Sequence, residues 1–252
     1  MKTVLAIFAH PDDAELTCFG TLGVLKSRGY RILVGIVTDG LAGLPDRRAH
    51  NRVKEAEEAS AIMGFELLRG ALPDGDLQYN NRLIVQMEQW LSEFQPAIVI
   101  THHYDPMGID HQDHIAVARA ALNIVNRKPQ VELLLQVEPP RGSRSFEPNA
   151  LVEVSEFAAE KLAAIACHKS QSHKAYFQPS YLNLRSSWWA AVAGLQDTPD
   201  DGNAVHVEAF RIGRCSIFSS SALAFSKPVA AAEDAMPAGE VRSAYPALRT
   251  AA

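Results

Sequence analysis

At 252 residues, the chain fits one large α/β unit better than two independent domains of ~100–200 residues each. Apolar residues make up 47% and charged residues 21%, a balance that supports a sizeable core and excludes a disordered or collagen-like chain. The 24 basic and 29 acidic side chains give a net charge of −5, which argues against nucleic acid and anionic membrane surfaces as partners.

In chain order, the apolar patterns predict a strand at 3–9, a helix at 13–28, a strand at 31–38, a helix at 48–63, a strand at 65–69, a helix at 82–94, a strand at 97–101, a helix at 112–126, a strand at 132–137 and a helix at 155–168. Continuous β-branched and apolar runs are typical of strands buried on both faces of a parallel sheet. The alternation predicts an α/β fold with one Rossmann-like, doubly wound, mainly parallel sheet and helices on both faces.

The pattern weakens after residue 171. Residues 204–212 alternate like an edge strand or a hairpin, and residues 229–252 are rich in alanine and proline with little periodicity. We therefore expect a single domain over 1–228 and a loosely held tail over 229–252.

The cysteines and the N-terminus indicate a cytoplasmic protein. Cys18, Cys167 and Cys215 are widely spaced and form no CxxC pair, so the sequence favours neither a disulfide framework nor a thiolate zinc site. The first apolar run is followed directly by acidic residues, which a signal peptide would not have there. The sequence contains no stretch of ~18 or more apolar residues, which crossing a bilayer would require, so we expect no membrane partner.

Two predicted strands end in unusual polar clusters. The sequence His10-Pro11-Asp12-Asp13 follows the first strand, and the segment 101–114 holds four of the nine histidines. In an open parallel sheet, ligands bind at the carboxyl ends of the strands, so both clusters are candidates for one site.

The residue types at these strand ends fit a metal. His10, Asp13 and one histidine of the second cluster would supply two imidazoles and one carboxylate, which leaves a fourth position for water, as in a catalytic zinc site. Asp12 would then be free to act as a base, and Asp113 would suit a partner that fixes a histidine tautomer. The simpler alternative is a capped strand-to-helix junction in which Asp13 complements the helix dipole.

A family resemblance can be named on these residues. The AHPDDAE stretch at 9–15 and the HQDH stretch at 111–114 resemble the two metal motifs of the PIG-L/LmbE-like de-N-acetylase family, which includes N-acetylglucosaminyl deacetylases and thiol-sugar amidases. The resemblance extends over about 2–171. The stretches RVKEAEEASAIMG at 52–64, PDGDL at 73–77 and HKSQ at 168–171 support it.

The resemblance implies a role for individual side chains. The implied ligands of Zn²⁺, or alternatively Fe²⁺, are His10, Asp13 and His114. Asp12 would be the general base. His111 would sit beside the substrate carbonyl as a cationic stabiliser or acid, with Asp113 hydrogen-bonded behind it.

Two further residues are implied to touch the substrate. Arg52 would contact it and Asp74 would receive sugar hydroxyls, although an Arg52–Glu55 surface pair and an ordinary turn at Asp74 are simpler alternatives. Some members of the family have a tyrosine where this chain has Ile109, so that tyrosine's part would have to come from elsewhere, with Tyr104 as a candidate.

Together these features predict a metal-dependent amide hydrolase that removes an acyl group, acetyl above all, from an N-acetylated amino sugar or its conjugate. The alternatives are an amidase acting on a thiol-sugar conjugate, a non-haem Fe(II) oxygenase that uses the same ligand types, and a non-catalytic sugar-binding module. The expected partner is a small amino-sugar molecule, and the sequence leaves open whether the chain forms a homo-oligomer.

Overall fold

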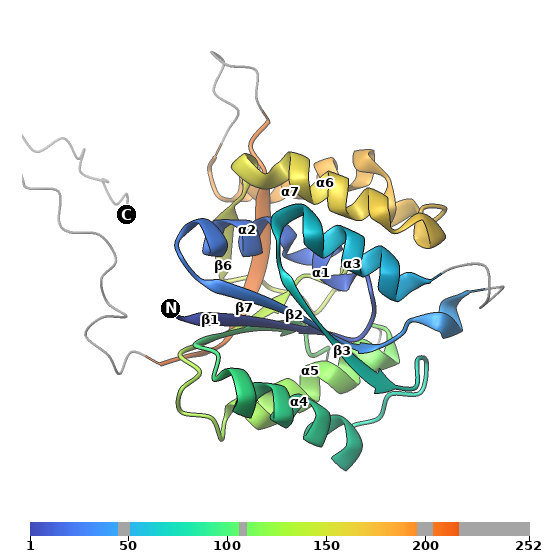
Figure 1. Cartoon of the computed structure of the whole chain (residues 1–252). Coiled ribbons are helices and arrows are strands. Elements are labelled where there is room, and N and C mark those ends of the chain that lie inside the picture. The colour runs from blue at the N-terminus through green and yellow to red at the C-terminus, as the bar shows by residue number, and fades with distance from the viewer. Residues whose placement is uncertain (45–50, 106–109, 196–203, 217–252) are drawn as a thin grey trace, which may run out of the picture. The chain divides into compact units, whose positions relative to one another are not determined.

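The computed structural model describes residues 1–44, 51–105, 110–195 and 204–216. Its centre is a seven-stranded sheet in the order β3-β2-β1-β4-β5-β7-β6 (Figure 1). The strands are β1 (Thr3–Phe8), β2 (Arg31–Thr38), β3 (Glu66–Leu72), β4 (Ile98–His102), β5 (Leu133–Val137), β6 (Ala150–Glu153) and β7 (Val207–Cys215). The pairs among β1 to β5 are parallel, and β7 is antiparallel to both β5 and β6. The predicted mainly parallel sheet is confirmed.

Helices cover both faces of this sheet (Figure 1). One face carries α4 (Asn81–Phe94) and α5 (Gln112–Val125), and the other carries α1 (Asp13–Thr17), α2 (Phe19–Ser27), α3 (Arg52–Met63), α6 (Ala158–Cys167) and α7 (Pro179–Val192). Leu5 and Ile7 of β1 pack into the core beneath α4 and α5. Val4, Ala6 and Phe8 alternate with them and pack into the opposite core. Because both faces of β1 are buried, its sequence is apolar without interruption.

Some boundaries differ from the predicted ones. The helix expected over 13–28 is divided at Cys18, whose φ of −139° is not helical, into the short α1 and the longer α2. The helix expected over 155–168 begins with a 3-10 turn and continues as α6. Other 3-10 turns in the described part of the chain lie at Leu41–Gly43, Lys169–Gln171 and Ala175–Phe177.

The region after residue 137 differs more. The edge strand or hairpin expected over 204–212 is the single strand β7, which lies inside the sheet between β5 and β6. The edge strand on this side of the sheet is β6, whose four residues are half-exposed or exposed and show no apolar pattern, and the sequence did not predict it. It did not predict α7 either.

The chain divides into one compact unit over Met1–Ser216 and a second unit over Ile217–Ala252. The predicted domain limit at 228 and the predicted tail at 229–252 lie outside the described residues. None of the helices in the described ranges has the length and apolar character that a bilayer span requires.

The strand order reverses direction at a defined point. From β1 the sheet continues through β2 and β3 on one side, and through β4 and β5 on the other. Such a reversal is the switch point of a doubly wound sheet, and ligands bind there, outside the carboxyl ends of the two central strands. His10 follows β1 and His102 ends β4, so the two polar clusters of the sequence meet at the carboxyl ends of these neighbouring strands.

Candidate active site

Three side chains converge at the carboxyl ends of β1 and β4. His10 Nδ1 lies 3.4 Å from Asp13 Oδ2, Asp13 Oδ1 lies 3.2 Å from His114 Nε2, and the two imidazole nitrogens lie 3.2 Å apart. All three residues are buried, with no more than 7% of their surface exposed. A tetrahedral zinc ion with bonds of ~2.0–2.1 Å would separate its ligand atoms by ~3.3 Å. The donor types fit a divalent ion, and each pair of side chains has two atoms at about this spacing, with the two histidines near different oxygens of Asp13.

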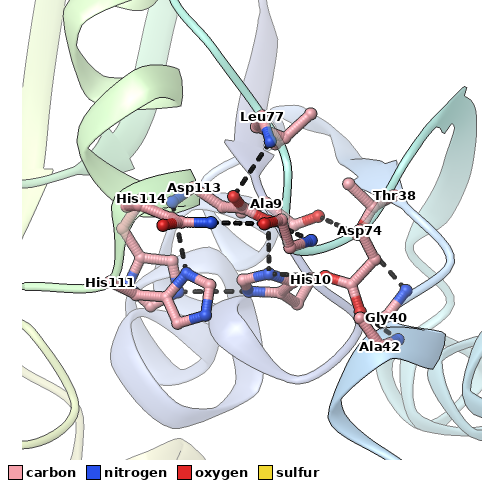
Figure 2. A network of polar contacts seen from close by, with 12 residues as sticks. Ala9, His10, Thr38, Gly40, Ala42, Asp74, Leu77, His111, Asp113 and His114 are labelled. Carbon is pink, nitrogen blue, oxygen red and sulfur yellow. Dashed lines mark hydrogen bonds and ion pairs between the residues drawn. The ribbon is translucent and has the colours of Figure 1, made fainter.

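The second nitrogen of each imidazole faces a carboxylate. His10 Nε2 lies 3.0 Å from Asp74 Oδ1 and 3.2 Å from Asp113 Oδ2. His114 Nδ1 lies 3.4 Å from Asp110 Oδ1. Figure 2 shows His10 in the centre, with His114 and His111 on one side and Asp74 on the other. Carboxylates in this position orient the histidine ligands of metal sites.

These acidic side chains make the site a place for positive charge. Burial lowers the pKa of His114, but Asp13 and Asp110 outweigh burial and raise that pKa to about 9. Burial likewise opposes protonation of His10, while its hydrogen bonds to Asp113, Asp13 and Asp74 raise its pKa well above the ordinary value. The same carboxylates would stabilise a bound cation.

Further potential metal ligands lie around His10, Asp13 and His114. The described residues contain three groups whose ligand atoms lie within 4.8 Å of one another and could hold a metal ion: His10, His111 and His114; Asp13, His102 and His114; and His10, Asp74 and Asp113. Each group includes His10 or His114, and none is the predicted set of His10, Asp13 and His114. The group with Asp74 and Asp113 lies at Nε2 of His10, the ring nitrogen other than the one near His114.

Asp113 contacts a different histidine from the one expected. Its carboxylate accepts hydrogen bonds from Gly75 N at 2.8 Å and Leu77 N at 3.1 Å, and it lies against His10. The side chain is fully buried. The prediction that this carboxylate stands behind His111 is wrong, because the amides of Gly75 and Leu77 hold its two oxygens and it lies against His10.

His111 caps the helix instead. It is the N-cap of α5, and its Nδ1 accepts a hydrogen bond from Asp113 N at 3.2 Å. Burial lowers the pKa of His111, and the nearby His10 and His114 lower it further. An accepting Nδ1 places the proton of a neutral ring on Nε2. The geometry favours a neutral hydrogen-bond donor over the cationic form that the resemblance implies.

His102 also belongs to the site, although the motifs in the sequence do not single it out. Its ring is stacked on His114 at 3.9 Å between centroids, and its Nε2 accepts a hydrogen bond from Ala9 N at 3.0 Å and lies 3.3 Å from Asp13 Oδ2. Burial and the charge of His114 lower the pKa of His102 to about 4, so this ring is neutral. In the sequence, only its position directly after the predicted strand 97–101 could have indicated that His102 belongs to the site.

Asp12 and Arg52 form a buried pair beside the three converging side chains. Arg52 Nη2 donates to Asp12 Oδ2 at 2.8 Å, and the side chains are 4% and 7% exposed. Burial raises the pKa of Asp12, and although Arg52 opposes this, the pKa remains above the ordinary value. The alternative of a surface pair between Arg52 and Glu55 is wrong, because both are buried and Glu55 binds the amide and hydroxyl groups of Ser170.

The remaining predicted residues are partly accounted for. Asp74 Oδ2 accepts from Ala42 N at 2.7 Å, so in addition to contacting His10 it joins two loops, which an ordinary turn would not require. Its pKa falls to about 2, because the His10 hydrogen bond and charge outweigh burial. Ile109 lies outside the described residues, and Tyr104 is half-buried.

Comparisons with known proteins agree with this geometry. The family model PIG-L, described as GlcNAc-PI de-N-acetylase, matches residues 5–125, a range that contains all eight predicted site residues. A probable N-acetyl-alpha-D-glucosaminyl L-malate deacetylase 2 of Bacillus cereus is 28% identical over 211 residues, which cover 77% of this chain and 94% of that protein.

Two further proteins resemble the chain over most of their length. The uncharacterized deacetylase YaiS of Escherichia coli is 32% identical over 174 residues, covering 67% of this chain and 91% of that protein. The crystal structure of the conserved protein TT1542 from Thermus thermophilus superposes with a TM-score of 0.68 at 26% identity, covering 87% and 98% of the two chains. The chain belongs to the PIG-L family of de-N-acetylases.

Proposed function

We propose that the chain is a metal-dependent amide hydrolase that removes an acetyl group from an N-acetylated amino sugar or its conjugate. The observation that carries the proposal is the meeting of His10, Asp13 and His114, whose nitrogen and oxygen atoms lie 3.2–3.4 Å apart in pairs, with the Asp12 carboxylate on the neighbouring residue. Family membership supports the same activity, since the relatives are named as deacetylases.

We assign the metal to zinc. Two imidazoles and one carboxylate without thiolate are the ligands of many catalytic zinc sites, and ferrous iron accepts the same set. A divalent ion held by His10, Asp13 and His114 would supply a Lewis acid for the acyl carbonyl and lower the pKa of a water at the site.

The protein's own residues then carry the proton transfers. Asp12 accepts the proton of the attacking water and then returns it to the leaving amine. Its raised pKa suits it to act as a base in the first step and as an acid in the second. The Nε2–H of His111 donates a hydrogen bond to the oxygen on which negative charge develops. A single donor of this kind is typically worth ~10²–10³ in rate.

A second candidate is an amidase that acts on a thiol-sugar conjugate. It is favoured by the relative in Bacillus cereus, which is named for a glucosaminyl conjugate of L-malate. The two candidates share the chemistry and differ in the group attached to the sugar. The Fe(II) oxygenase and the sugar-binding module are disfavoured by family membership.

The decisive experiment is a paired measurement of metal content and acetate release from a panel of N-acetylated sugars and sugar conjugates. We expect about one ion per chain, and we expect the Asp12→Ala variant to keep the ion and lose about 10²–10⁴-fold in kcat. The Asp76→Ala variant, which changes an exposed carboxylate in a nearby turn, serves as the control. Full activity of the Asp12 variant would refute its role as the base.

We also propose a cytoplasmic location and a single domain over 1–228. The wide spacing of the three cysteines and the lack of a CxxC pair in the sequence support a reducing compartment. We expect a small-molecule substrate and neither a nucleic-acid nor a membrane partner, in line with the net charge of −5.

A further inference from the structure

Two cations lie against one aromatic ring. The guanidinium carbon of Arg141 is 5.3 Å from the centroid of the Tyr176 ring, and Lys174 Nζ is 5.7 Å from the same centroid. Both distances are within the range of a cation–π contact. In the part of the chain that the structure describes, neither cation forms an ion pair with a carboxylate, so both charges are available to a ligand.

The ring lies close to the proposed base. Tyr176 packs against a buried apolar cluster that contains Leu16, and Leu16 N donates to the carbonyl of Asp12 at 3.0 Å. Burial, together with the negative charges of Asp12 and Asp13, raises the pKa of the Tyr176 hydroxyl to about 12. The half-buried Lys174 interacts with the same two carboxylates. Tyr176 and Lys174 therefore border the candidate active site.

Arg141 is presented by an anchored loop. It follows β5, whose carboxyl end lies beside that of β4 in the sheet. The Tyr181 hydroxyl donates to the carbonyl of Pro140 at 2.8 Å. Arg185 of α7 donates to the carboxylate of Glu138 at 2.5 Å and to its carbonyl at 2.7 Å. Because α7 holds the backbone just before Arg141, the guanidinium is kept at a defined place.

The arrangement is suited to an anion. Burial lowers the pKa of Lys174, and the positive charge of Arg141 is among the effects that lower it further. A bound anion would offset both effects. A guanidinium stacked on an aromatic ring keeps the N–H groups of its edge free for a carboxylate or a phosphate. The simpler alternative is that the two cations only balance the acidic side chains of the site.

We propose that Arg141 and Lys174, against the ring of Tyr176, form a subsite for an anionic group, a carboxylate or a phosphate ester, on the amino-sugar substrate. This inference rests on the proposed function, because it names the class of substrate that the same site takes. Hydrogen bonds to charged groups are typically worth a factor of ~10–100 in affinity, and exposed ion pairs are worth less. Since Arg141 is exposed, we expect a preference of about 10-fold for a charged substrate.

Matched pairs of N-acetylglucosamine derivatives test the subsite. Each pair differs only in charge: a carboxymethyl group is compared with its methyl ester, and a phosphate with a methyl ether, at the anomeric oxygen and at O6. We expect at least one charged member to have a KM about 10-fold below that of its uncharged partner at similar kcat, and we expect added salt to reduce the difference. The two kinds of pair show whether a carboxylate or a phosphate is taken. Equal KM values within every pair would overturn the proposal.

Substitutions test the two cations. Arg141→Ala and Lys174→Gln should each raise KM for the preferred charged probe by about 10-fold and change KM for its uncharged partner by less than about 2-fold. Arg144→Ala and Lys169→Gln, at exposed positions of the same two segments, are the controls and should match the wild type. Equal losses on both members of the pair would show that the cations only balance the acidic side chains, and would overturn the proposal.

The outcomes separate this inference from the proposed function. Hydrolysis of all probes with a KM that does not depend on charge would refute this inference alone. A wild type that hydrolyses none of the probes would refute the proposed function, and binding of the deacetylated probes, measured by calorimetry, then tests the subsite without turnover. We expect the charged amine to bind about 10-fold more tightly than its uncharged partner, and this difference to be lost in the Lys174→Gln variant. Equal affinities in the wild type would overturn the subsite.

Discussion

Replacing Asp113 with alanine should affect stability and metal binding together. The change removes the acceptor of two amide groups, Leu77 N in the core and Gly75 N at its margin, and the partner of His10 Nε2. An orphaned buried donor costs ~1–3 kcal/mol, so with one fully and one partly buried amide we expect a loss of about 3 kcal/mol in the free energy of unfolding. At a urea dependence of ~1–3 kcal/mol per molar, the unfolding midpoint should fall by ~1–3 M.

The same variant should bind metal more weakly. Removing the carboxylate behind a ligating histidine typically costs ~10–100-fold in metal affinity. Urea unfolding of the metal-free protein and a zinc titration of the folded protein measure the two effects separately. Asp76→Ala changes an exposed carboxylate between Gly75 and Leu77, the residues that Asp113 binds, and is the matched control. An Asp113→Ala protein that equals this control in both measurements would refute the assigned role.

Three other experiments test separate parts of the structure. His102→Phe keeps a ring against His114 but removes the acceptor of a buried backbone amide, and it should lower the unfolding free energy by ~1–3 kcal/mol in urea; unchanged stability would contradict that contact. A thiol reagent should modify exposed Cys215 quickly and leave Cys18 unmodified in the native state, because burial raises the pKa of Cys18 well above its ordinary value; equal labelling rates would exclude the described packing. Glu208→Ala removes the acceptor of two amides at the start of α2 and the partner of Lys161, so the unfolding midpoint should fall by an amount equivalent to ~3–5 kcal/mol, and a shift under ~1 kcal/mol would count against a buried pair.

The sequence predicted those parts of the fold that its apolar pattern determines. Strands such as β1 and β4 are buried on both faces, so their residues are continuously apolar and stand out in the sequence. In contrast, β6 is short and half-exposed, and α7 begins at Pro179 with apolar side chains such as Leu184 and Trp188 facing outward, so neither has a distinct periodicity. The interior position of β7 depends on long-range pairing that local patterns do not contain.

The candidate site also has features that the sequence predicts and features that it does not. The motifs predicted which residues gather, because they follow strands of one parallel sheet, whose carboxyl ends lie at the same edge. They could not predict which side chain contacts which. Asp113 faces His10 because of how α5 and the turn at Gly75 pack, and Arg52 is buried on Asp12 because Gly40 leaves room for it. Such contacts depend on differences of a few ångströms between elements that are far apart in the sequence.

One measurement tests the proposed hydrolase most directly: acetate release from an N-acetylglucosaminyl conjugate by chelator-treated protein, followed as zinc is added back. We expect no release without metal and full recovery at about one equivalent of zinc, with no recovery in the His114→Ala variant. Hydrolysis that persists in the chelated protein, or that returns equally in the His114 variant, would show that the site formed by His10, Asp13 and His114 does not carry the reaction.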